Sequence, residues 1–162
     1  MEQGSRFFTI VSVVVVGLVL QLFLGLMDSR QTPTKVAVAF TKAYFQLDRS
    51  MEDYLCDEFT AEDTDIVGTF INNVGDQARV VGYSLNFMRS RLFSVHTEIL
   101  SETDSEVEIH ISGTRTRNIN PIFTVIGAIF RLGETHTFDE ALRLVKENGR
   151  WKVCGKAFSL RV

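Results

Sequence analysis

The longest uncharged stretch of the chain, from Phe7 to Met27, constrains the fold more than any other feature. As a helix rising about 1.5 Å per residue, its 21 residues would extend roughly 30 Å, the thickness of a bilayer's hydrocarbon core. A cleaved secretory signal is the alternative, but such a signal has a shorter apolar region that ends at paired small residues, which are missing around 25–29. We therefore predict a single-pass membrane protein with a tail over 1–6, an uncleaved transmembrane helix over 7–27 and a linker over 28–32.

The basic residues on either side of this helix leave its orientation open. Arg6 lies on the N-terminal side, whereas Arg30, Lys35 and Lys42 lie on the C-terminal side. Counting Lys and Arg alone favours a cytoplasmic C-terminal domain, but large domains cross the membrane largely regardless of charge. A very short N-terminal tail is also typical of a signal anchor that exports its C-terminal domain. We favour an inner-membrane protein whose C-terminal domain lies on the periplasmic side.

Residues spaced four apart form a stripe along the predicted transmembrane helix. The stripe includes Gly17, Gln21 and Gly25, preceded by Thr9 and Val13. Small residues let a second helix approach closely, and a glutamine within the bilayer gains from a hydrogen-bonding partner. Alternatively, the glycines are incidental, since glycine is common in membrane helices, and Gln21 faces lipid. We predict that Gly17, Gln21 and Gly25 bind a partner helix.

Residues 28–162 are numerous enough to form one compact domain with a hydrophobic core. Setting aside Arg6 and Glu2 from the totals of 17 basic and 20 acidic side chains leaves 16 and 19 in this part of the chain. The resulting net charge of −3, without a cluster of Lys and Arg on one element, argues against nucleic-acid binding.

Cys56 and Cys154 are the two cysteines of the chain. In an oxidising compartment an isolated pair favours a disulfide, and the spacing fits no metal motif. However, the alternation of the last predicted strand places Cys154 on the polar face of its sheet, away from where a packed helix would bring Cys56. We therefore do not expect the disulfide, although the sequence leaves it open.

Three helices are predicted at the start of the head, residues 33–162. Thr32 followed by Pro33 indicates a helix start, with the threonine as cap and the proline in the first turn. Ser50 begins a shorter second helix, and Thr60 caps a third. Helical spacing predicts these buried faces: Val36, Phe40, Ala43, Tyr44 and Leu47; Met51, Tyr54 and Leu55; Ile66, Phe70, Ile71 and Val74.

After Gly82 the apolar residues alternate, which predicts a strand from Tyr83 to Ile99 with a bend or bulge at Arg89 and Arg91. A turn over 102–105 then leads to a second strand. One register gives this hairpin an apolar and a polar face. It pairs Ile99 with Val107, Thr97 with Ile109 and Val95 with Ile111.

A second hairpin is predicted at Asn148-Gly149, because both turn positions need a positive φ. Its register pairs Leu144 with Val153, Lys146 with Trp151 and Phe138 with Ser159. The predicted fold is therefore α+β, with helices packed on one face of a curved antiparallel sheet of about four strands.

Three helices followed by such a sheet, with a last strand that begins Asn148-Gly149-Arg150-Trp151-Lys152-Val153, resemble the NTF2-like (cystatin-like) superfamily. The resemblance covers roughly Pro33 to Val162. The superfamily includes enzymes, ligand-binding domains and membrane-anchored scaffold domains of bacterial envelope machines, and fold alone does not choose among them. A single-pass anchor followed directly by this fold looks most like the scaffold group.

Histidines and carboxylates on the predicted sheet are the candidates for chemistry. The register of the first hairpin places His96 opposite His110 and Glu98 opposite Glu108, and such a group can bind a divalent metal. A solvated outer face explains the same pattern and is favoured. His136 shares the apolar face, where burial shifts a pKa, but no second titratable group is predicted beside it, so an ordinary edge histidine is favoured. We predict no catalytic residue, metal or cofactor.

The segment Ile119–Leu132 is unusually apolar for a connection between two strands. Asn120 and Pro121 could start a helix that is apolar on all sides and too short to span a bilayer. Such a segment is buried in the core, or it docks on a partner or the membrane interface. Burial and docking are evenly balanced, and we favour partner binding by Ile122, Phe123, Ile126, Ile129 and Phe130.

These features together favour a non-catalytic accessory or scaffold subunit of a membrane protein complex. Its expected partners are other subunits and the lipid bilayer, with no nucleic acid. The alternative is a small-molecule-binding or enzymatic NTF2-like domain tethered to the membrane.

Overall fold

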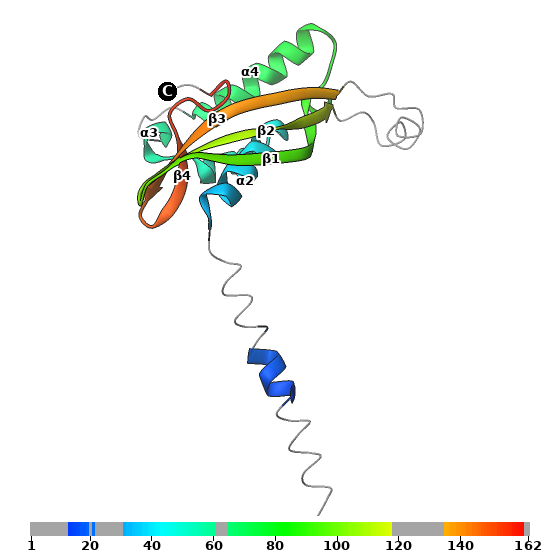
Figure 1. The fold of residues 1–162 in the computed structure, drawn as a ribbon. Coiled ribbons are helices and arrows are strands. Elements are labelled where there is room, and N and C mark those ends of the chain that lie inside the picture. Colours follow the sequence, from blue (N-terminus) through cyan, green and yellow to red (C-terminus); the bar gives the residue numbers. More distant parts are fainter. Residues whose placement is uncertain (1–12, 20, 22–30, 61–64, 118–134, 161–162) are drawn as a thin grey trace, which may run out of the picture. The chain divides into compact units, whose positions relative to one another are not determined.

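The computed structural model describes residues 13–19, 21, 31–60, 65–117 and 135–160 (Figure 1). The chain divides into two compact units, Met1–Gln31 and Thr32–Val162, and the second contains the head. In the first unit, residues 13–19 and 21 are helical. No helix within the described ranges is long and apolar enough to cross a membrane. Most of the predicted span lies outside those ranges, so the transmembrane helix over 7–27 stays a prediction.

The first helix of the head, α2 (Pro33–Phe45), begins as the sequence predicts. The Thr32 side chain accepts a hydrogen bond from the Lys35 backbone N–H at 3.3 Å, and Pro33 occupies the first turn, where its missing N–H costs nothing. Val36 and Phe40 are buried as expected. The cap of this helix is therefore confirmed.

The short second helix is present as the 3₁₀-helix η1 (Arg49–Tyr54), which starts one residue before Ser50. The start of the third helix differs from the prediction. Thr60 does not cap the third helix, because it ends the short α3 (Asp57–Thr60), and α4 (Ile66–Val80) starts after Asp65. The Asp65 carboxylate accepts the Gly68 N–H at 2.7 Å and so provides the cap.

The described residues then form an antiparallel sheet of four strands in the order β1-β2-β3-β4, which agrees with the predicted α+β class and sheet of about four strands. They are β1 (Ser90–Glu102), β2 (Glu106–Arg117), β3 (Thr135–Glu147) and β4 (Arg150–Cys154). The predicted start of the first strand at Tyr83 is wrong, because 85–88 form the short helix α5 (Leu85–Met88).

The register of β1 on β2 is shifted by two residues from the prediction. Ile99 pairs with Ile109 and Thr97 with Ile111, so the apolar face is preserved although each partner is wrong. The bulge is not at Arg89 and Arg91. It lies between Phe93 and His96, where Ser94 has a φ of 50°, and a second irregularity lies between Ile99 and Ser101.

The hairpin of β3 and β4 has the predicted register where it is paired. Leu144 lies opposite Val153 and Lys146 opposite Trp151, and the turn residues Asn148 and Gly149 have φ values of 50° and 79°. The expected pair of Phe138 with Ser159 is absent from the described ladder, because β4 ends at Cys154.

Helix α2 packs across one face of the sheet and contacts all four strands (Figure 1). The sheet contributes fully buried side chains from alternate positions of β2 and β3, and the resulting core is continuous. The fully buried strand residues of this core are Val107, Ile109, Ile111, Leu142, Leu144 and Val153, and Phe138 and Cys154 also belong to it.

Candidate functional site

Aromatic rings fill the interface between the helices and the sheet. Tyr44 of α2 stacks on Phe158 with ring centroids 4.6 Å apart and on Phe70 of α4 at 5.0 Å. Phe45 packs against Phe138 of β3 at 5.0 Å and against Phe158 at 5.2 Å. These rings lie where a helix-on-sheet domain would otherwise enclose a ligand, so the central part of this interface is packed with side chains.

Two arginines of β2 continue the row of core-facing residues beyond the packed rings. Ile109 and Ile111 are buried, and Arg115 and Arg117 follow at the same alternation, near the end of the strand. We call Arg115 and Arg117 the arginine pair. Both are half-buried, and the signal was visible in the sequence as an alternation that ends in cations.

Each guanidinium of the arginine pair lies over an aromatic ring. The central carbon of Arg115 is 5.0 Å from the centroid of Phe45, and that of Arg117 is 5.8 Å from Phe87 of α5. Burial lowers the pKa of Arg115, the neighbouring charge of Arg117 lowers it further, and Tyr44 acts in the opposite direction. Arg115 nevertheless stays charged, as arginine does in proteins.

Gly113 shapes the sheet beside the arginine pair. A Cβ atom at this position would come within 2.9 Å of the Phe138 ring and 3.3 Å of the Phe93 carbonyl oxygen. The glycine therefore lets the Phe138 ring lie against β2, directly opposite in the register.

His136 of β3 lies opposite Arg115 in the register and is half-buried. The sequence placed it on the apolar face but did not predict a second ionisable group beside it. The reason is that the pairing of β2 with β3 was not predicted.

The other histidines do not form the metal group considered from the sequence. His96 pairs with Ser112 rather than His110, and Glu98 pairs with His110, because the register differs by two. His110 instead lies 2.7 Å from a carboxylate oxygen of Asp139 on the neighbouring strand. In the described part of the chain, only Cys56, Glu147 and Cys154 bring three possible ligands together, and both sulfurs are in a disulfide.

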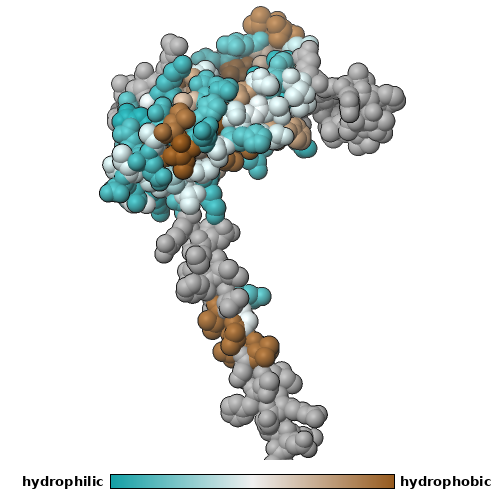
Figure 2. All heavy atoms as spheres, viewed as in Figure 1, coloured by the Kyte–Doolittle hydropathy of each residue, from teal (hydrophilic) through white to brown (hydrophobic). Residues whose placement is uncertain are grey.

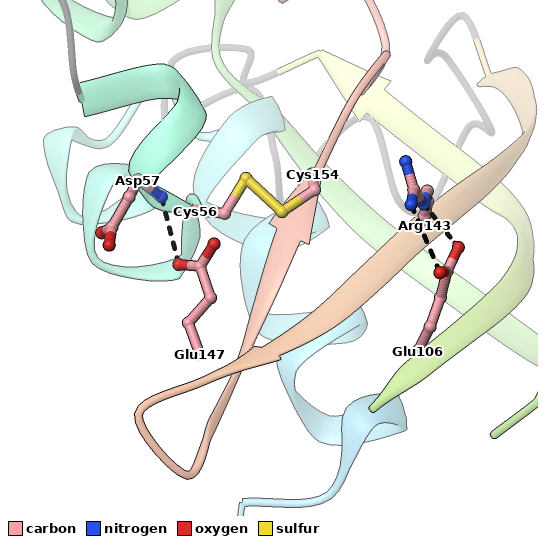
Figure 3. Close-up of a disulfide and its surroundings, with 6 residues drawn as sticks. All are labelled: Cys56, Asp57, Glu106, Arg143, Glu147 and Cys154. Carbon is pink, nitrogen blue, oxygen red and sulfur yellow. Dashed lines mark hydrogen bonds and ion pairs between the residues drawn. A yellow bond between two sulfur atoms is a disulfide. The ribbon is translucent and has the colours of Figure 1, made fainter. Parts of the chain in front are cut away.

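The disulfide joins Cys56 to Cys154, whose Cα atoms are 5.4 Å apart (Figure 3). This corrects the sequence expectation that the two cysteines stay apart. The segment after η1 runs beside β4, with a parallel bridge between Leu55 and Val153 and a 3.0 Å hydrogen bond from the Cys56 N–H to the Val153 carbonyl. Cys56 therefore reaches the end of β4 along its edge, rather than across the face of the sheet.

Strand β1 is an edge of the sheet and carries exposed apolar side chains. The strand order leaves its outer edge without a neighbouring strand among the described residues. Phe93, Ile99 and Leu100 are 52%, 47% and 52% exposed. Figure 2 shows hydrophobic side chains, in brown, interrupting the mostly teal and white surface of the head. We call these three residues together with the outer edge of the strand the β1 edge.

The partner-binding residues predicted from the sequence lie mostly outside the described ranges. Gly17 and Gln21 are helical, and a Cβ atom at Gly17 would meet nothing within 4 Å. Outside the described residues lie Gly25, Ile122, Phe123, Ile126, Ile129 and Phe130. Their roles stay predictions.

Comparisons with known proteins add no relative. No protein-family model, curated protein or solved structure matches the chain.

Proposed function

We propose that this chain is a membrane-anchored, non-catalytic accessory or scaffold subunit of a membrane protein complex. The proposal includes a transmembrane helix over 7–27 and an NTF2-like head. The observation that carries it is the β1 edge, whose outer backbone groups pair with no strand of the described residues and whose Phe93, Ile99 and Leu100 are exposed.

An exposed edge strand is a template for pairing with another chain, and proteins usually cover or charge such an edge. β1 spans 13 residues, and it pairs regularly with β2 in two short stretches, from Ser90 to Phe93 and from His96 to Ile99. Its outer N–H and C=O groups can therefore accept an extended segment of another subunit as an additional strand. The exposed apolar side chains would add burial to those backbone hydrogen bonds.

The disulfide supports the proposed location of the head. Disulfides persist in oxidising compartments and are rare in the reducing cytosol. A bond between Cys56 and Cys154 therefore favours a head on the periplasmic side of the inner membrane. This orientation agrees with a signal anchor that has a short N-terminal tail.

The packing of the head supports a non-catalytic role. Tyr44, Phe45, Phe138 and Phe158 occupy the space between α2 and the sheet, where an NTF2-like enzyme would need room for its substrate. A docking subunit needs no such cavity.

The test uses the full-length chain, expressed at native level with an affinity tag and recovered from membranes in a mild detergent. Phe93→Ser with Ile99→Ser removes two of the three exposed apolar side chains of the β1 edge, and we expect the recovery of co-purifying subunits to fall at least about fivefold. Val80→Ser with Val81→Ser is the matched control, since these residues are 87% and 63% exposed on a different element. Equal recovery with both variants, each with wild-type thermal stability, would refute docking at the β1 edge.

A further inference from the structure

We propose that the arginine pair is a binding site for a small organic anion, a carboxylate or a phosphate carried on an apolar body. Nothing in the proposed docking function requires this site, so it stands independently of that function.

The two guanidinium groups are arranged to act together. Arg115 and Arg117 are two positions apart on β2, so their Cα atoms are about 7 Å apart and their side chains leave the same face of the sheet. Strand β1 pairs Leu92 with Arg115 and Ser90 with Arg117, which places the pair beside the start of β1. A single anionic headgroup can therefore reach both side chains.

The arginine pair has no anionic partner within the described ranges. The ion pairs of arginine that form there involve Arg49, Arg79 and Arg143. The Nε atom of Arg115 is buried without a hydrogen-bond acceptor among the described residues. Buried donors are nearly always satisfied, so this Nε–H is a donor that an added acceptor would pair.

The chemistry of the surroundings defines the ligand class. Guanidinium groups bind carboxylates and phosphates through two parallel hydrogen bonds, and they do so more strongly where water is partly excluded. Phe45 and Phe87 supply aromatic surface under the two cations, which can also contact an apolar ligand body. The half-buried position of Arg115 favours a small molecule over an acidic segment of a protein.

The alternative explanation is structural: the guanidiniums pack on rings and bind nothing. Cation–π contacts of this kind are common in proteins. The two explanations predict different results with an added anion. Binding at the arginine pair saturates if the pair is a site, and no saturable binding occurs there if the guanidiniums only pack on rings.

The experiment uses the full chain in lipid nanodiscs, with empty nanodiscs as the blank. Binding is followed through the side-chain Nε–H NMR signals of arginine, assigned with Arg115→Lys and Arg117→Lys. The probes are benzoate, phenyl phosphate, inorganic phosphate and a hexa-aspartate peptide. We expect benzoate or phenyl phosphate to shift both signals saturably at low millimolar concentration or below, and the tighter of the two identifies the headgroup.

The variants separate a site from general electrostatic attraction. Arg115→Gln and Arg117→Gln should each weaken binding about ten- to a hundredfold, the size expected for losing a charge-assisted hydrogen bond. Arg91→Gln is the matched control. Arg91 pairs with Thr116, between the two arginines, but projects from the opposite face.

Three results would overturn the proposal. They are no saturable shift with any small anion, equal weakening by Arg91→Gln, and saturation by the aspartate peptide alone. Arg117→Gln keeps the test decisive if Arg115→Gln fails to fold.

Discussion

Cys56 and Cys154 are 98 positions apart in the sequence, yet a disulfide joins them where the segment after η1 runs along β4. The bond closes a loop that contains the whole sheet and the helices after η1, while α2 and η1 lie outside it. The backbone hydrogen bond from Cys56 to Val153 holds the same junction, so covalent and hydrogen-bonded links coincide there.

Replacing Cys154 by Ser should therefore destabilise the head strongly. A loop of about 100 residues predicts a loss near 4–5 kcal/mol, and native disulfides typically contribute about 2–5 kcal/mol. Chemical denaturation of the full chain, with and without reductant, measures this loss. The double variant Cys56→Ala/Cys154→Ala should be insensitive to reductant. A wild-type midpoint that reductant leaves unchanged would contradict the prediction.

Two glycine substitutions should act in opposite directions. Gly113→Ala places a methyl group 2.9 Å from the Phe138 ring and should cost about 1–3 kcal/mol through overpacking. Gly75→Ala in α4 meets its nearest atom, in Leu85, at 3.8 Å and should stabilise the fold by about 0.5–1 kcal/mol. Thermal melts compare the two variants, and a stabilised Gly113→Ala would show that Phe138 does not pack there.

Acid should weaken the head through Asp65, the cap of α4. The Gly68 N–H lowers the pKa of this carboxyl, burial opposes the shift, and Arg49 lowers the pKa as well. Because the folded-state pKa is depressed, the contribution of Asp65 is complete above its ordinary pKa near 4 and is lost as the pH falls through the lowered value. Asn retains a capping oxygen without a charge.

We therefore expect the melting temperature of Asp65→Asn to fall less than that of the wild type between about pH 5 and pH 3. Asp104→Asn, in the exposed turn between β1 and β2, is the control. If the melting temperatures of the wild type and Asp65→Asn fall equally between pH 5 and pH 3, the Asp65 cap does not contribute to the acid sensitivity.

The N-terminal stripe predicts a change in assembly without a change in insertion. Gly17→Ile adds bulk that prevents close helix approach, and Gln21→Leu removes a hydrogen-bonding group at no cost in lipid. The double variant should remain in the carbonate-resistant membrane fraction, while its recovery with partner subunits falls. Val15→Leu with Val19→Ile changes apolar bulk on the side of the helix away from the stripe and should leave recovery unchanged. Wild-type recovery of the double variant would show that the stripe does not bind a partner.

The sequence predicted the features of the head that depend on neighbouring residues. Thr32 with Pro33 starts a helix, and Asn148 with Gly149 makes a turn, because each depends on local backbone chemistry. The period of two also placed Ile109 and Ile111 on the buried face. A two-residue shift of register does not alter that periodicity.

Features that depend on distant contacts were not predicted. The turn after β1 pairs Glu102 with Val107, and with the irregularity between Ile99 and Ser101 this sets His96 opposite Ser112 rather than His110. The positive φ of Ser94 likewise has no signal in residue type. The disulfide depends on the bridge between Leu55 and Val153, which no local pattern indicates. The arginine pair was visible as an alternation along β2, but its position beside Phe45 required the packing of α2.

We propose that the chain works as part of a larger assembly. The mass of the particle that contains the chain, extracted gently from native membranes, tests this most directly. The chain itself has a mass of 18.3 kDa. After gentle solubilisation and native electrophoresis, calibrated for bound detergent, we predict that the wild-type chain migrates well above this mass. Mass spectrometry should identify other membrane proteins in the same band, and the Phe93→Ser/Ile99→Ser variant should move toward the monomer. Migration of the wild-type chain as a lone monomer, with no co-migrating protein, would contradict the claim.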